Sequence, residues 1–353
     1  NYPSIIHPNA RWGAAHAYKQ FSSLEEKIEA VGWNTGNIVF TNSIINLLEC
    51  EIVSEDAEEG TLSNFDQFIT TELIWLRENV QPWLSLTKQL EKAGDKPLVP
   101  ISIGLQSKYF KKDFCLHPEI ISILKAMEEK TCFAVRGIYT YDILYKNGIR
   151  NMEVIGCPSL YQIPLYQNSF DFLKDYKYGK AVSNFRTFDT DLTEKEYKVL
   201  KYLSKNCDGF VEQTFDYIQN INGSDSEIDK WIEDSKSIYF DVDTWLLNSK
   251  KYNFSIGSRF HGNVMAILSG VPALFLAIDS RTKEMTNFFD LPSLEFEDFD
   301  EYRTMEYYRD STNYDNFIKK YNYNTQNFIS YLSKCNINIS EKYKEKFSNF
   351  LLK

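Results

Sequence analysis

Short apolar runs alternate with amphipathic segments along most of this chain, and this alternation limits the folds that it can adopt. Each run has the continuous apolar character of a parallel strand that is buried on both faces. The segments between them, of which Leu73–Ala93 and Pro118–Glu129 are the clearest, repeat apolar residues with a helical period. Strands that alternate with helices predict an α/β protein with parallel sheets. The predicted strands are Pro100–Leu105, Cys132–Val135, Glu153–Ile155, Ala181–Asn184, Gly209–Val211, Phe254–Ile256 and Pro272–Ala277.

The length of the chain favours two domains, because 353 residues exceed what one hydrophobic core usually holds. The polar and aromatic segment Phe170–Gly179 separates two strand-like runs near the middle of the chain. We therefore predict a Rossmann-like domain over residues 1–175 and a second over 176–353, facing each other across a cleft. The sequence from Phe296 onward is rich in Tyr, Asn, Lys and Glu, and it predicts C-terminal helices that pack across the two domains.

Charge and composition exclude several classes of partner. The net charge of −10 argues against a general affinity for nucleic acid or anionic lipid. No apolar stretch approaches the ~20 residues that a membrane span needs, and no signal peptide is recognised. The six cysteines form no C-x-x-C pair, and the four histidines lack zinc-site spacing. We expect free thiols, no metal site and a cytoplasmic protein.

The segment Ser255–Asn263, SIGSRFHGN, is the strongest candidate for a ligand site. Ligands of parallel α/β sheets bind beyond the carboxyl ends of the strands. Arg259 and His261 lie between a strand that ends near Gly257 and a helix that is predicted to start near Gly262 and Asn263. Free N–H groups at a helix N-terminus attract anions, so these residues could hold a phosphate and carry a proton. A surface arginine with a capping histidine is the structural alternative.

Further polar residues follow other predicted strands. Arg186 closes the first strand of the second half, and Arg281 and Lys283 follow the strand after the main motif. Their convergence predicts a ligand with several negative charges, such as a phosphate with a carboxylate, which arginine binds through its bidentate fork. A solvated loop is the alternative for 279–284, and a simple helix cap for the turn at 34–37. The candidates in the first half are Asn34, Gly36, Asn37, Gln106 and Arg136.

Taken together and in their order along the chain, the motifs resemble those of the polysaccharide pyruvyl transferase family. The resemblance extends from about Gly32 to Pro292. The resemblance rests on N-T-G, G-L-Q, V-R-G, V-I-G-C-P-S-L, N-F-R, S-R-F-H-G-N and D-S-R-T-K-E. It implies a GT-B-like fold, a catalytic Arg259 and a His261 that acts as general acid. It also implies donor binding by Arg186, Arg259, Arg281 or Lys283, with Gly262 and Asn263 beside them. Two departures are Asn37, where many members have aspartate, and the lack of a typical first strand before Asn34.

The resemblance implies a transfer of pyruvate from phosphoenolpyruvate to a sugar, with a ketal formed and phosphate released. The acceptor would be a bacterial surface polysaccharide or its lipid-linked precursor, with at most peripheral association with the inner face of the membrane. No metal, further cofactor or nucleic acid is expected. A histidine with a near-neutral pKa contributes roughly 10²–10⁴-fold as an acid.

Two other functions stay open. A GT-B glycosyltransferase would place a nucleotide sugar in the same cleft, although no clear acidic residue is available for the ribose hydroxyls. A saccharide-binding protein would use the many Tyr and Trp side chains, but it would gain nothing from the Arg259 and His261 pair.

Overall fold

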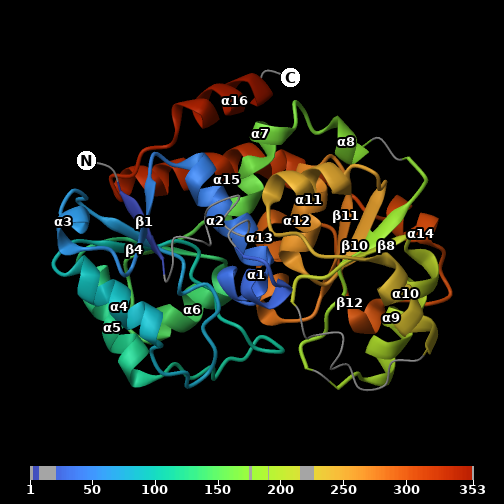
Figure 1. Ribbon diagram of the computed structural model, residues 1–353, viewed down its shortest axis with the longest axis horizontal. Helices are drawn as coiled ribbons and strands as arrows, with labels where there is room; N and C mark the ends of the chain where they lie inside the picture. The colour runs from blue at the N-terminus through green and yellow to red at the C-terminus, as the bar shows by residue number, and fades with distance from the viewer. Residues whose placement is uncertain (1–2, 8–20, 175–176, 190, 215–225, 352–353) are drawn as a thin grey trace.

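The computed structural model contains two α/β halves that lie side by side, with C-terminal helices along one edge (Figure 1). The strands of the first half lie within residues 4–154 and those of the second within 181–295. The predicted domain boundary at 175 and 176 falls on residues outside the description. The described residues are 3–7, 21–174, 177–189, 191–214 and 226–351.

The first half has a parallel sheet in the order β2-β1-β3-β4. An isolated parallel bridge between Ile103 and Val135 continues the pairing toward β5 and β6, which pair with each other. Strand β1 lies inside the sheet between β2 and β3, so the expected lack of a first strand before Asn34 is wrong. The strands are β1 Ser4–His7, β2 Glu51–Ser54, β3 Phe68–Thr70, β4 Leu98–Pro100, β5 Phe133–Val135 and β6 Met152–Val154.

Two predicted elements of the first half differ in their bounds. The predicted strand Pro100–Leu105 is interrupted, because β4 ends at Pro100 and Ser102 adopts a left-handed φ of 65°. The Ser102 hydroxyl donates to the carbonyl of Gly156 at 2.9 Å, which fixes this bend. The predicted helix Leu73–Ala93 is helical only as α4, Leu84–Ala93. Its apolar N-terminal residues are buried because the chain there runs beside 104–106, with Leu76 bridged to Leu105.

The second half has a six-stranded parallel sheet in the order β12-β11-β10-β7-β8-β9. Renumbered within this half, the order is the Rossmann order 3-2-1-4-5-6. The direction of winding reverses between β7 and β10, where such sheets bind their ligands at the carboxyl ends. The strands are β7 Ala181–Ser183, β8 Gly209–Val211, β9 Lys236–Ser237, β10 Phe254–Gly257, β11 Ala273–Ala277 and β12 Ser293–Glu295.

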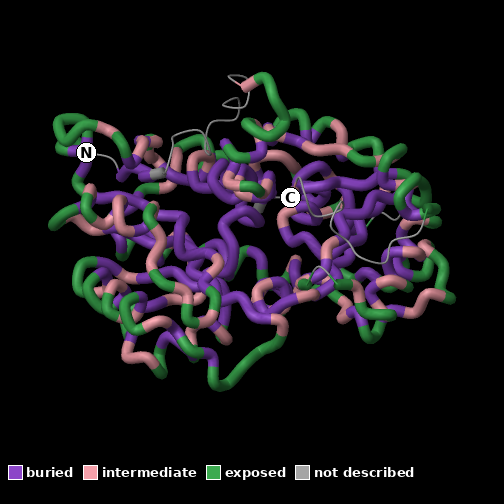
Figure 2. Tube along the Cα trace, turned by 60° about the horizontal axis from the view of Figure 1, so that its bottom comes forward, coloured by how far each residue is buried: buried purple, intermediate pink, exposed green. Residues whose placement is uncertain are grey.

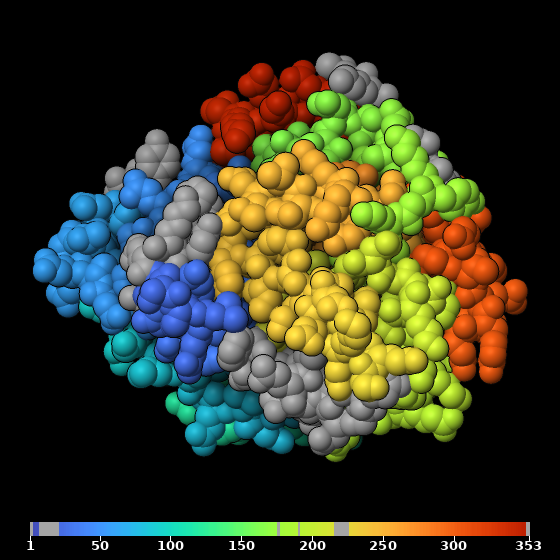
Figure 3. All heavy atoms as spheres, turned by 45° about the vertical axis from the view of Figure 1, so that its right-hand side comes forward, coloured from blue at the N-terminus to red at the C-terminus, as the bar shows by residue number. Residues whose placement is uncertain are grey.

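Helices flank both sheets and meet between the halves, where α2 contacts α11 and α12. Figure 3 shows the yellow to orange segment with α11 and α12 beside the dark blue α1. In chain order the helices are α1 Leu24–Ala30, α2 Gly36–Leu47, α3 Glu59–Leu62, α4 Leu84–Ala93, α5 Pro118–Glu128, α6 Ile138–Lys146, α7 Ile163–Tyr166, α8 Asp171–Lys174, α9 Glu194–Asn206, α10 Ser226–Ser235, α11 Val242–Ser249, α12 Phe260–Leu268, α13 Ser280–Phe289, α14 Met305–Asp310, α15 Asp315–Lys334 and α16 Glu341–Leu351, with 3₁₀ turns at Pro158–Gln162 and Phe296–Asp298.

The C-terminal helices tie the two halves together. Helix α15 packs on α13 of the second half, and its Tyr331 hydroxyl donates to the carbonyl of Cys132 in the first half at 3.1 Å. Beyond α15, the amide of Ser340 donates to the carbonyl of Leu47. One apolar cluster accordingly contains residues of both halves, and Figure 2 shows buried segments inside each half and between them. The protein is thus a GT-B-like pair of Rossmann-like units.

Candidate active site

A cavity of about 420 Å³ opens at the carboxyl ends of β7 and β10, at the point where the winding reverses. Both halves line it. Among the described residues, its wall carries seven arginine and lysine side chains against three carboxylates, in a protein of net charge −10. Such a wall concentrates positive potential where the rest of the molecule is acidic. Of the predicted site residues, it brings together Asn34, Asn37, Gln106, Arg136, Arg186, Arg259, His261 and Arg281.

The floor beneath the cavity is held by two asparagines. Asn263 accepts hydrogen bonds from the Asn184 amide and the Ser255 hydroxyl, both at 2.8 Å, and donates to the carbonyl of Gly257. A side chain on Gly262 would meet Asn184 at 2.8 Å, so the glycine permits this close approach. Neither Gly262 nor Asn263 lines the cavity. The geometry therefore gives both a structural role, unlike the donor contact that the motif predicted.

Arg259 enters the cavity already held by protein groups. Its guanidinium donates to Glu212 at 3.2 Å and to the Thr214 hydroxyl at 2.6 Å, and only 6% of the residue is exposed. Arg259 is also the N-cap residue of α12, where its side chain makes no capping hydrogen bond. Arg186 lies across the same strand ends, because its backbone amide donates to Ser258. Strand ends and a helix N-terminus thus orient two arginines toward one space.

His261 is the second residue of α12, so it does not occupy the cap position that the structural alternative required. Its Nε2 lies 3.6 Å from the Cys157 thiol. Burial, together with the charges of Arg136 and Arg281, holds the pKa of His261 well below its ordinary value. The near-neutral pKa expected from the sequence is therefore wrong for the unliganded site. The imidazole is neutral there, and an anion beside it would favour its protonation.

Arg136 is the most deeply buried cation of the site, with 1% of the residue exposed. Its Nε donates to Ser102 at 3.1 Å, and among the described residues one terminal nitrogen has no hydrogen-bond partner. Burial, together with the charge of Arg281, lowers its pKa to about 10. A Cβ at Gly104 would lie 2.6 Å from the Arg136 side chain, which explains this motif glycine. A buried guanidinium with an open donor favours an anionic ligand.

Arg281 and Lys283 occupy different places. Arg281 lines the cavity and lies 3.8 Å from Asp279, the residue that caps α13. Lys283 lies outside this cavity, where it pairs with Glu295 at 2.6 Å. The Gln106 amide donates to Asp279 across the two halves at 3.1 Å.

A family model for polysaccharide pyruvyl transferase matches residues 81–280, which is more than half of the chain. The chain belongs to the polysaccharide pyruvyl transferase family. The match includes the strand ends that carry Gln106, Arg136, Arg186, Arg259 and His261, together with Asp279. No curated protein matches the chain.

Solved structures with similar folds are distant. The S. aureus MnaA–UDP structure has 12% identity and a TM-score of 0.41, with 98% of this chain and 94% of that chain covered. A putative UDP-N-acetylglucosamine 2-epimerase from Listeria monocytogenes has 11% identity and a TM-score of 0.41, with 99% and 94% covered. The wall teichoic acid polymerase TagF (H548A) has 14% identity and a TM-score of 0.39, with 85% and 76% covered. The fold assignment rests on the strand order above.

Several charged residues of this family member's cavity were not predicted from the sequence. Lys108 pairs with Asp189 across the halves at 2.9 Å, and Lys111 pairs with Glu78. Arg77 also lines the cavity. Arg77 and Glu78 lie in the segment Leu73–Ala93 that periodicity predicted as helix, so they were not recognised as strand-end residues. Lys108 and Lys111 come two and five positions after the predicted Gln106, and this proximity was the signal that could have found them.

A contact across the halves explains another motif glycine. Glu284 of α13 accepts hydrogen bonds from the Thr140 amide at 2.6 Å and the Thr140 hydroxyl at 2.8 Å, at the start of α6. A Cβ on Gly137 would lie 2.2 Å from the Glu284 side chain. Burial raises the pKa of Glu284 to about 7. The V-R-G glycine therefore makes room for a carboxylate of the other half.

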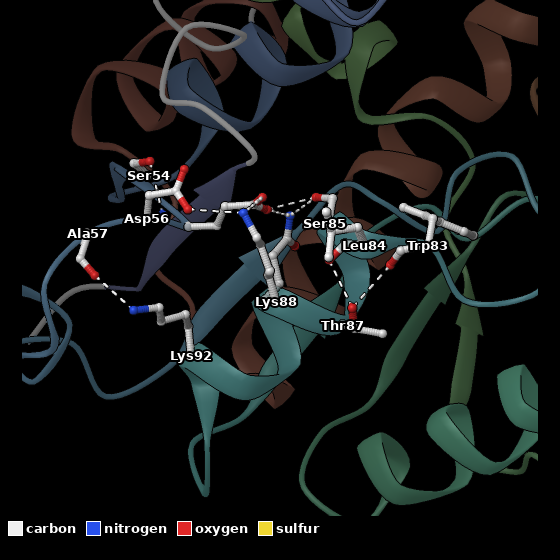
Figure 4. Close-up of polar contacts among 11 residues, drawn as sticks. Ser54, Asp56, Ala57, Trp83, Leu84, Ser85, Thr87, Lys88 and Lys92 are labelled. Atoms are coloured by element: carbon white, nitrogen blue, oxygen red, sulfur yellow. Dashed lines mark hydrogen bonds and ion pairs between the residues drawn. The ribbon is translucent and has the colours of Figure 1, made fainter.

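A second polar cluster lies beyond the carboxyl ends of β2 and β3 (Figure 4). Lys88 reaches Asp56 at 3.2 Å, and Ser85 donates to the buried Glu55 at 2.8 Å. The Trp83 indole donates to the buried Glu72. None of these side chains lines the cavity. They join α4 to the strand ends.

No helix among the described residues is long and apolar enough to cross a membrane.

Proposed function

We propose that this family member transfers pyruvate from phosphoenolpyruvate to two hydroxyls of a sugar, forming a ketal and releasing phosphate. The observation that carries the proposal is the open guanidinium of Arg136 beside His261 in a cationic cavity. Phosphoenolpyruvate is small and carries both a phosphate and a carboxylate. Arg136, Arg186 and Arg281 could bind these two groups, while Arg259 stays oriented by Glu212.

The proposed chemistry balances with the groups at hand. His261 gives a proton to C3 of the enol, and one sugar hydroxyl bonds to C2. A second hydroxyl of the sugar then displaces phosphate from C2, and the two hydroxyl protons leave on phosphate and on the imidazole. Arginines around the departing phosphate stabilise its charge.

The low pKa of free His261 fits this sequence of events. Burial of the ring, together with the charges of Arg136 and Arg281, disfavours the imidazolium until a counter-charge arrives. A bound phosphate and carboxylate would supply that charge and raise the pKa. The acid would therefore be loaded only when the donor is present.

A direct assay tests the proposal. The protein is incubated with phosphoenolpyruvate and a panel of synthetic and lipid-linked glycosides, and mass spectrometry follows the mass of the acceptor. We expect a gain of one pyruvate less one water, together with release of phosphate. Thermal shifts provide the second arm: phosphoenolpyruvate should stabilise the protein and UDP-sugars should not. Stabilisation by a UDP-sugar alone would support the glycosyltransferase alternative instead.

A further inference from the structure

An aromatic loop projects beside the mouth of the cavity. Tyr109 and Phe110 follow the cavity residues Ser107 and Lys108, and they are 65% and 40% exposed. Both side chains line a small pocket next to this cavity, where a ligand that extends out of the cavity could cover them. The function proposed above does not use either ring.

Contacts within the loop restrain the backbone at Tyr109 and the ring of Phe110. The Ser107 hydroxyl donates to the Tyr109 carbonyl at 2.5 Å. Phe110 stacks on Tyr139 with ring centroids 4.6 Å apart, and the Lys283 ammonium lies 5.7 Å from the centre of the Phe110 ring. Within the part of the chain that the structure describes, the Tyr109 ring and hydroxyl have no partner. The hydrogen bond restrains the backbone at Tyr109, and a tyrosine side chain has only two torsions, so little entropy is lost when a ligand covers the ring.

A small pocket of about 90 Å³ joins this loop to the cavity. Lys108, Ile278 and Asp279 line both spaces, so the two are neighbours. Tyr109 lines this pocket, so a saccharide that extends along it from the cavity would pass the Tyr109 ring.

The local charge decides between a sugar and a membrane surface as the occupant. Lys108, Lys111 and Lys283 would attract anionic lipid, but Asp189, Glu78 and Glu295 pair with them in turn. Glu297 adds a further carboxylate to the pocket wall. A mixed wall of carboxylates and ammonium groups beside an aromatic ring suits neutral hydroxyls better than an anionic surface.

We propose that Tyr109 is a stacking platform for a sugar ring of the acceptor, with the Lys283 and Glu295 pair bordering it. This inference rests on the proposed function, because it assumes that a saccharide enters the adjoining cavity. The platform would hold a ring next to the one that receives pyruvate, so it favours an acceptor of at least two sugars.

The experiment compares Tyr109→Ala and Tyr109→Phe with wild type, and uses Tyr302→Ala as control at another tyrosine, 89% exposed. For Tyr109→Ala we expect the KM for an oligosaccharide acceptor to rise roughly three- to tenfold. The KM for phosphoenolpyruvate should stay unchanged. Tyr109→Phe and Tyr302→Ala should resemble wild type. An unchanged acceptor KM in Tyr109→Ala, with wild type active, overturns the platform and leaves the function intact. A Phe variant as impaired as Ala overturns stacking as the contact.

A second readout separates failure of the platform from failure of the function. Saturation-transfer NMR measures the binding of the same oligosaccharides without turnover. If wild type transfers nothing but binds saccharide, and Tyr109→Ala does not, the platform stands while the pyruvyl transfer fails. If wild type neither transfers nor binds, both proposals fall. Co-sedimentation with vesicles containing an anionic phospholipid is the last arm. Binding that Tyr109→Ala abolishes would make the loop a membrane contact and overturn the saccharide platform.

Discussion

The thiol of Cys157 lies 3.6 Å from Nε2 of His261, and the Ser159 hydroxyl lies 3.0 Å from the same sulfur. Burial raises the pKa of Cys157, so the thiol stays protonated. A protonated thiol can donate to Nε2 of a neutral imidazole. That contact would place the ring proton on Nδ1 and fix the orientation of the ring.

Cys157→Ala should therefore slow turnover without weakening donor binding. We expect a fall of roughly 2- to 10-fold, the size of one neutral hydrogen bond. Cys157→Ser keeps a donor and should lose less. Cys207→Ala, at a buried cysteine outside the cavity, is the matched control. Equal rates in Cys157→Ala and wild type would show that the thiol has no part in orienting the ring.

Replacement of His261 tests the acid itself. His261→Asn should lower turnover by at least ~100-fold while the melting temperature changes little, because His261 does not cap α12. Steady-state kinetics and thermal unfolding measure the two effects on the same preparation. A stable variant with near-normal turnover would end the general-acid assignment.

Donor binding should take up a proton at His261. Its pKa is well below 6.5 in the free site, and a bound phosphate and carboxylate should raise it. Between the two pKa values, affinity for phosphoenolpyruvate therefore falls as pH rises, by up to about tenfold per pH unit. Calorimetry in buffers of different ionisation enthalpy counts the protons taken up on binding. We choose a range of about pH 7 to 8 because it lies above the phosphate pKa of about 6, so that the phosphate adds little to the count. His261→Asn should abolish the uptake. Identical uptake in both proteins would assign the proton to another group.

Arg136→Met should change stability and binding in opposite directions. The unliganded protein should become as stable as wild type or more stable, because the change removes a buried guanidinium in which one terminal nitrogen has no hydrogen-bond partner among the described residues. The affinity for phosphoenolpyruvate should fall by roughly 10- to 100-fold, as expected for a lost charged hydrogen bond. Melting temperatures with and without the donor show both effects. Arg303→Met, at an exposed arginine that does not line the cavity, is the control. A variant that is still fully stabilised by the donor would exclude Arg136 from its binding.

Glu284 should make the stability of the protein depend on pH. Its pKa rises from 4.5 to about 7 on folding, so the folded state holds the proton more tightly than the unfolded state. This contribution is fully present below about pH 4.5 and is lost as pH rises toward 7, up to roughly 3 kcal/mol. Glu284→Gln cannot titrate there. Denaturant unfolding of both proteins at pH 5 and pH 8 should show a larger loss for wild type, and equal losses would contradict the assignment.

The residues at the strand ends could be predicted from the sequence, whereas the contacts between distant segments could not. Arg186, Arg259 and Arg281 converge as expected, because parallel strands place their carboxyl ends along one edge. Arg77 was missed because the apolar residues around it follow helical spacing in the sequence. In the structure they are buried by pairing with the neighbouring segment, where Leu76 bridges to Leu105. The low pKa of His261 could not be predicted either, since it depends on the burial of the ring and then on the charge of Arg136, which comes from the other half.

The contact between Gly137 and Glu284 also constrains how this family can vary. The two positions lie in different halves, yet a methyl group at 137 would overlap the Glu284 side chain. A relative that gains a larger residue at 137 must move, shorten or remove the side chain at 284, and each of these changes disturbs the hydrogen bonds from Thr140. We expect the two positions to change together across relatives. A chimera that joins halves of divergent members would therefore have mismatched side chains, and steric overlap, at this contact.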